Sequence, residues 1–334
     1  MTIQVHFLLI SLNQVCTNKR TKTTETILGV VGVTCWDLTE NKIIINVDEQ
    51  KELNINLLNF LVETTKLVDD NYDSRYTLVT EEDIIVMDKH YGRNVSLEDG
   101  IRRPELVAPR TKNRFTFERV LRGEDMAYYW YRVFVYIADY ANSIPQFRML
   151  SIEDQCQLFR HNFGFISWVA YSHRLKDVDR TNGWPIGNGA YLPVDGLPDY
   201  GPKRLDLPNT QNIMSRFESL LSDPYKELEV DMHELCFIKT ILLFQFEENL
   251  SSQGREICIQ IQNRLLDSLH DYQIIRFPEW TNAMRSRRQS KILLLLPRIS
   301  QVMHLEHDIQ LVLSVFGTIN LDGIPHELLF YNNK

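Results

Sequence analysis

A few pairs of side chains in this sequence combine residue types that could hold a metal ion or form a nucleophile. His304 and His307 lie three residues apart, a spacing at which two imidazoles can share one metal ion. Cys156 is followed by His161, and a second histidine stands close to Cys236. No further ligand converges on the two histidines, and neither Cys–His pair has a third group to orient its base. We therefore expect surface histidines, no metal site and no catalytic residue, and we predict that the protein is not an enzyme.

The composition indicates a globular protein. The 334 residues are 44% hydrophobic and 24% charged, and the formal net charge is −8. Such an acidic surface repels phosphate backbones, so we expect no direct binding of nucleic acid. The five cysteines are an odd number and widely spaced, which is typical of reduced thiols in the cytosol or nucleus. No apolar run approaches the ~20 residues of a membrane span, so we expect no membrane partner.

The largely apolar segment 147–172 contains three polar side chains that need an explanation: Asp154, Gln155 and Arg160. A buried polar group without a partner costs ~1–3 kcal/mol, so Asp154 and Gln155 should have partners. We expect them to tie a turn of the preceding helix to this one. Ser151, three residues before Asp154, is a capping-box-like helix start.

Helical periodicity begins at residue 51 and places this segment among other helices. The spacing of apolar residues predicts a helix over 51–68, and a second from about 118 to 143 that ends before Pro145. Between them, residues 69–114 are polar with scattered Pro and Gly, which predicts a long surface loop. The helix after Ser151 is apolar on nearly every face, so it should run through the middle of the domain.

The second half of the chain is also predominantly helical. Residues 180–210 are rich in Gly and Pro and predict turns with a small β-hairpin near 185–197, after which apolar periodicity resumes. We expect an N-terminal extension over 1–50 that is poorly ordered, and one all-α domain over 51–334.

Four motifs, in order along the chain, resemble the ligand-binding domain of nuclear hormone receptors. The first is PQFRMLSIEDQCQLFR, which resembles the family signature at Phe147, Leu150, Asp154 and Gln155. HELCFIKTILLF looks like the family's eighth helix, RRQSKILLLLP like its tenth, and IPHELL, with Glu327, like its terminal activation helix. LFRHNF is similar to the nematode branch related to hepatocyte-nuclear-factor receptors. The resemblance implies an all-α, three-layer antiparallel helical sandwich.

Family members normally begin with a zinc-binding domain that reads DNA and needs eight cysteines within a short span. Here only Cys16 and Cys35 precede Cys156. We therefore expect the chain to lack the DNA-binding domain, and we expect no zinc site.

The resemblance also implies a groove that docks coregulator helices with a Leu-x-x-Leu-Leu motif. Opposite charges cap the dipole of the docked helix, with Arg160 expected at its carbonyl end and Glu327, followed by Leu328, at its amide end. The family's basic residue at the end of the third helix corresponds to Asn142 here, which should weaken the clamp. The alternative is that Arg160 is only a solvated helix charge.

Ligand contacts in the family come from its third, fifth and eleventh helices, which implies a small lipophilic ligand and no other cofactor. The corresponding residues on the third and fifth helices are Met126, Trp130, Val133, Gly164, Ser167, Trp168 and Tyr171. Arg174 matches a position where relatives hold the polar end of a ligand. The alternative is that these bulky rings fill the cavity themselves.

The region of the tenth helix implies a dimer face through Arg288, Lys291 and Leu295, towards other nuclear receptors or a second copy. The run of five apolar residues at 292–296 is too long for one buried face, so part of it should be exposed. The alternative is a monomer that covers this patch with its C-terminal segment.

The resulting hypothesis is ligand-responsive transcription regulation in the nucleus, with the cytoplasm as a second compartment. The alternative is a decoy that has no functional ligand pocket and acts by dimerising with full-length receptors.

Overall fold

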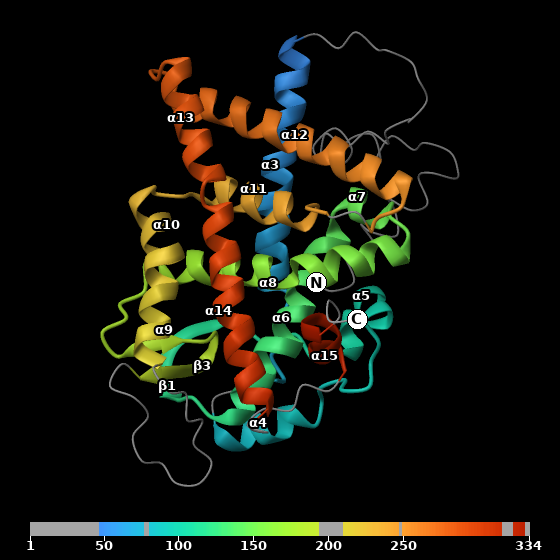
Figure 1. The fold of residues 1–334 in the computed structure, drawn as a ribbon, viewed down its shortest axis with the longest axis vertical. Coiled ribbons are helices and arrows are strands. Elements are labelled where there is room, and N and C mark those ends of the chain that lie inside the picture. Colours follow the sequence, from blue (N-terminus) through green and yellow to red (C-terminus); the bar gives the residue numbers. More distant parts are fainter. Residues whose placement is uncertain (1–46, 77–79, 194–209, 247–248, 316–322, 331–334) are drawn as a thin grey trace.

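The structure is a computed structural model that describes residues 47–76, 80–193, 210–246, 249–315 and 323–330 (Figure 1). The expected extension over 1–50 lies outside these residues except for its last four, which already belong to the first helix. The elements, in chain order, are α3 Val47–Asp70, α4 Glu81–Asp88, α5 Leu97–Arg102, the 3₁₀ turn η1 Pro104–Leu106, β1 Arg114–Val120, α6 Gly123–Ser143, α7 Pro145–Arg148, α8 Ile152–Leu175, β2 Gly183–Pro185, β3 Asn188–Pro193, α9 Thr210–Phe217, the π turn η2 Glu218–Ser222, α10 Asp223–Glu227, α11 Met232–Leu243, α12 Ser252–Arg276, α13 Asn282–Leu293, α14 Leu296–Val315 and α15 Ile324–Phe330.

Helix α8 lies in the middle of the domain, as its apolar sequence predicts. It packs against α6, α11, α14 and α15, and α3 closes the domain against α11 and α12 (Figure 1). Phe159, Phe163 and Ile166 on α8 are each at most 3% exposed. They join one hydrophobic core that continues through α3, α6, α11, α12 and α14. The all-α prediction is confirmed.

The prediction of a long surface loop over 69–114 is wrong, because this stretch contains α4, α5 and η1. Both helices begin at a Ser/Thr-x-x-Asp sequence. Thr80 and Asp83 form a reciprocal capping box, and the Ser96 hydroxyl accepts a hydrogen bond from the Asp99 amide at 3.1 Å. Side-chain caps satisfy amides that would otherwise have no partner, so short helices can form in a polar stretch.

The predicted hairpin is present at β2 and β3, slightly earlier than expected, and β1 pairs in parallel with β3 to give the order β1-β3-β2. The helix predicted from about residue 118 therefore begins only at Gly123, because β1 occupies the residues before Leu121. The partner strand of β1 lies about 70 residues further along the chain, so no local pattern indicates it.

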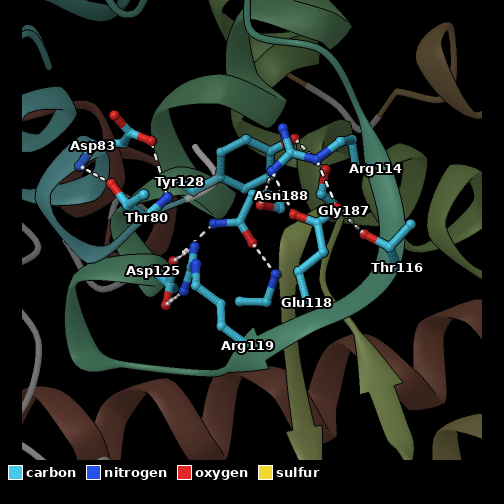
Figure 2. Close-up of polar contacts among 11 residues, drawn as sticks. Thr80, Asp83, Arg114, Thr116, Glu118, Arg119, Asp125, Tyr128, Gly187 and Asn188 are labelled. Carbon is cyan, nitrogen blue, oxygen red and sulfur yellow. Dashed lines mark hydrogen bonds and ion pairs between the residues drawn. The ribbon is translucent and has the colours of Figure 1, made fainter. Parts of the chain in front are cut away.

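A buried carboxylate joins this sheet to α6 (Figure 2). Asp125, fully buried near the start of α6, accepts two hydrogen bonds of 2.7 Å from the Arg119 guanidinium and one of 2.8 Å from Asn188 Nδ2. It also accepts the Arg122 backbone amide at 2.8 Å, which caps the helix. One side chain therefore fixes β1, β3 and the first turn of α6 relative to one another.

Candidate functional site

Asp154 and Gln155, the polar pair in the central helix, both have partners but join different parts of the fold. Gln155 Nε2 donates to the backbone carbonyls of Phe147 at 2.9 Å and Leu150 at 3.2 Å, which ties α7 to α8 as predicted. Asp154 instead accepts from Ser251, through its amide at 2.9 Å and its hydroxyl at 2.6 Å. The prediction that Asp154 also holds the preceding turn is wrong, because its carboxylate fixes the start of α12.

The C-terminal helix α15 packs onto α5, α6 and α8 (Figure 1). Ile324 at its start is fully buried, and Leu328 is half-buried against the main core. One oxygen of the Glu327 carboxylate is ion-paired with Arg160 on α8, and the other accepts the Leu97 amide of α5 at 3.3 Å. The Arg160 and Glu327 side chains thus contact each other in this structure, and their expected roles at opposite ends of a docked helix stay a prediction.

Asn142, near the end of α6, contacts the carboxyl end of α5, whereas Glu327 contacts its amino end. Its side-chain amide Nδ2 donates to the Ile101 carbonyl at 2.6 Å. Asn142 and Glu327 thus contact the two ends of α5, with a neutral donor facing a carbonyl and a carboxylate facing an amide. This polarity matches a helix dipole at both ends.

The aromatic residues expected around a ligand pack against other rings. Trp130 stacks on Phe163 with ring centroids 5.7 Å apart, and Trp168 contacts Phe217 at 4.4 Å and Tyr171 at 5.4 Å. Of the remaining candidates on these helices, Ser167 Oγ donates to the Gly164 carbonyl at 2.8 Å and Val133 is half-buried. The Met126 side chain lies outside what the structure describes.

Arg174, expected to hold the polar end of a ligand, contacts groups of the protein itself. Its guanidinium is ion-paired with Asp69 at the end of α3. It also lies 5.4 Å from the Phe115 ring centroid and 5.9 Å from that of Tyr136. A ligand carboxylate at this position would therefore compete with Asp69 for the same cation.

Two of the three residues expected on a dimer face instead contact buried parts of the domain. Arg288 donates to the fully buried Glu234 carboxylate at 2.6 and 2.7 Å, and Leu295 is only 2% exposed. Lys291 is exposed, and Leu294 is 64% exposed. The break between α13 and α14, just before Pro297, turns the apolar run so that only part of it faces outward.

Lys239 on α11 is a fully buried lysine. Its Nζ lies 3.9 Å from the Tyr140 ring centroid and donates to Thr65 Oγ1 at 3.1 Å. Burial raises the pKa of the neighbouring Cys236 thiol. A lysine over an aromatic face in the core is a packing arrangement that no sequence periodicity indicates.

Among the described residues, no group of three His, Cys, Asp or Glu side chains could hold a metal ion. Within the same ranges, no helix is both long enough and apolar enough to span a membrane.

Comparisons with known proteins agree on one family. The model of the ligand-binding domain of nuclear hormone receptors matches residues 111–316. Similar curated proteins include three from Caenorhabditis elegans. Nuclear hormone receptor family member nhr-4 is 29% identical over 67% of this chain and 44% of its own length. Member nhr-100 is 21% identical over 72% and 55%, and member nhr-61 is 25% identical over 67% and 54%. The chain therefore spans about half the length of these relatives.

Proposed function

Because this chain belongs to the nuclear hormone receptor ligand-binding domain family, whose members are ligand-regulated and non-enzymatic transcription factors, we propose that it regulates transcription in the nucleus by docking coregulator helices. The docking groove lies between the end of α6, the start of α8 and α15. Its partners are coregulator proteins that present a Leu-x-x-Leu-Leu helix.

The observation that carries this proposal is the placement of Asn142 and Glu327. They lie at the two ends of one short helix and offer each end the complementary group. A coregulator helix of the same polarity would place its first amides at Glu327 and its last carbonyls at Asn142. Arg160 on α8 contributes indirectly, because its ion pair with Glu327 holds that carboxylate, and with it α15, in place.

The test is the binding of a fluorescent Leu-x-x-Leu-Leu peptide to the whole chain, measured by anisotropy. Glu327→Ala removes the carboxylate that would accept the first amides of the peptide, together with the ion pair to Arg160, so we expect at least about fivefold weaker binding. Glu63→Gln is the matched control, since it neutralises an exposed carboxylate on α3. If Glu327→Ala and Glu63→Gln bind the peptide equally well, the groove has been assigned to the wrong surface.

A small lipophilic ligand is the second part of the proposal, and α6 and α8 supply its expected contacts. The packing of Trp130, Trp168 and Tyr171 against other rings, together with the Arg174–Asp69 ion pair, favours the alternative of a filled core. Native mass spectrometry of the purified chain separates the two. A copurified lipophilic molecule supports a working pocket, whereas its absence, together with no thermal shift from fatty acids or sterols, supports the decoy.

Dimerisation with a second copy or another receptor would use the exposed side of α13 and the start of α14. Lys291 and Leu294 lie there, but Leu295 does not. Light scattering of the wild type and of Leu294→Asp tests this surface. A dimer that persists unchanged in Leu294→Asp would place the interface elsewhere.

A further inference from the structure

The short helix α5 is bound at both ends by groove residues. Its first amide, that of Leu97, donates to Glu327 Oε2 at 3.3 Å, and the carbonyl of Ile101, near its other end, accepts from Asn142 Nδ2 at 2.6 Å. The helix packs against α6, α8 and α15, the three elements that bound the proposed groove (Figure 1). It therefore lies where a coregulator helix would lie, and with the same direction.

The face that α5 turns toward the groove has the spacing of a docking motif. Leu97 is 1% exposed and Ile101 is fully buried, and Gly100 lies between them on the same face. These are positions i, i+3 and i+4, as in Leu-x-x-Leu-Leu. The intervening Glu98 and the following Arg102 are exposed and pair with each other at 3.1 Å.

Helix α5 packs closely against its neighbours at Gly100. A Cβ added at Gly100 would lie 2.7 Å from Ile324 Cδ1, 3.0 Å from Val107 Cγ2 and 3.1 Å from Phe134 Cε1. Glycine thus lets α5 approach α15 and α6 more closely than any other residue would. Such close packing leaves no room for a second helix on the same surface.

The segment that carries α5 joins the rest of the domain at a narrow base. Its base is closed by a hydrogen bond of 2.8 Å from the Gly92 amide to the Val107 carbonyl, so residues 93–106 form a loop with adjacent ends. An isolated helix of six residues is unstable in water, so α5 owes its helical form to the surface beneath it. The start of α15 lies against this base, because a Cβ at Gly323 would overlap the Arg93 carbonyl.

We propose that α5 is an internal occupant of the coregulator groove, a helix of this chain that a coregulator must displace in order to bind. The inference rests on the proposed function and adds how it is regulated. A competing partner carries apolar residues at the spacing of Leu97, Gly100 and Ile101, with its amino end toward Glu327. Its apparent affinity is reduced by the fraction of molecules in which α5 is docked.

The experiment measures the same fluorescent peptide against whole-chain variants in which α5 is loosened. One carries Leu97→Ala and Ile101→Ala, which remove both buried side chains. A second has residues 97–102 replaced by alternating Gly and Ser, which keeps the length of the loop and removes the helix. The control is Glu98→Gln with Arg102→Gln, which changes only the exposed face. Circular dichroism and a cooperative thermal transition verify that each variant folds.

We expect both loosened chains to bind the peptide at least about tenfold more tightly than the wild type, and the control to match the wild type within about twofold. Adding Glu327→Ala to the Gly/Ser chain should then weaken binding, because α5 no longer needs the carboxylate in that chain whereas the peptide still does. If the wild type and all variants bind equally well, α5 does not occupy the groove, although the proposed function stands. If none binds, the proposed docking function fails and the inference fails with it.

Discussion

Replacing Asp154 with alanine tests whether the carboxylate fixes the start of α12 from the centre of the domain. The side chain is 4% exposed and accepts two hydrogen bonds from Ser251, at 2.9 and 2.6 Å. A hydrogen bond to a charged group contributes ~1.5–3 kcal/mol. We take the lower end for each bond, because the substitution also removes a charge from the interior. The free energy of unfolding should therefore fall by about 3 kcal/mol.

A neighbouring glycine makes the same prediction sharper through a double-mutant cycle. A Cβ at Gly254 would overlap Asp154 Oδ2 and lie 2.7 Å from its Cγ, so Gly254→Ala must displace the carboxylate. We expect this substitution to cost about 2 kcal/mol in the wild type and almost nothing in Asp154→Ala. The two effects are non-additive because both act through one carboxylate.

Urea unfolding followed by circular dichroism measures the cycle, and Glu153→Ala is the control. Glu153 is the exposed neighbour on the first turn of α8, so its loss should change the free energy of unfolding by no more than about 0.5 kcal/mol. The reasoning fails if Asp154→Ala is as stable as Glu153→Ala. It also fails if the costs of Asp154→Ala and Gly254→Ala simply add.

Three further outcomes follow from buried ionisable groups. Glu234→Ala should lower the free energy of unfolding by ~3–5 kcal/mol, because the largely buried Arg288 guanidinium loses the carboxylate that pairs with it. A loss of less than about 1 kcal/mol, measured by urea titration, would contradict this prediction. Burial lowers the pKa of His173 to about 4, so the folded state binds a proton less readily than the unfolded state does, and stability should fall as the pH drops from about 6.5 towards 4. Melting curves recorded over this pH range should show a smaller decline for His173→Gln than for the wild type. An equal decline in the two proteins would refute the prediction. Burial raises the pKa of Cys156 to about 11 and that of Cys258 to about 12, so neither thiol should react with iodoacetamide at neutral pH until the chain unfolds. Peptide-resolved mass spectrometry measures the alkylation of each cysteine. Rapid alkylation of the native chain would count against their burial.

The sequence predicted features that depend on local pattern. The apolar faces of α8 indicated its central place, and the hydrogen bonds from Gln155 to Phe147 in α7 and to Leu150 just after it span only eight and five residues. The two short helices in 69–114 also had a local signal, the Ser/Thr-x-x-Asp starts at Thr80 and Ser96, but scattered Pro and Gly outweighed it.

Contacts between distant segments were not predictable in the same way. The partner of Asp154 stands 97 residues away at Ser251, and β1 pairs with a strand about 70 residues later. Asn142 and Glu327 both contact α5, which the resemblance could not indicate because α5 lies outside its four motifs. Whether two charges lie apart or in contact, as for Arg160 and Glu327, is decided by tertiary packing.

The most direct test of the account is hydrogen exchange of the whole chain with and without the Leu-x-x-Leu-Leu peptide. If a coregulator helix takes the place of α5 in the groove, amides of residues 96–103 should exchange faster on binding while those of 324–328 exchange more slowly. Peptide binding that leaves both segments unchanged would contradict the account, since the peptide would then occupy another surface.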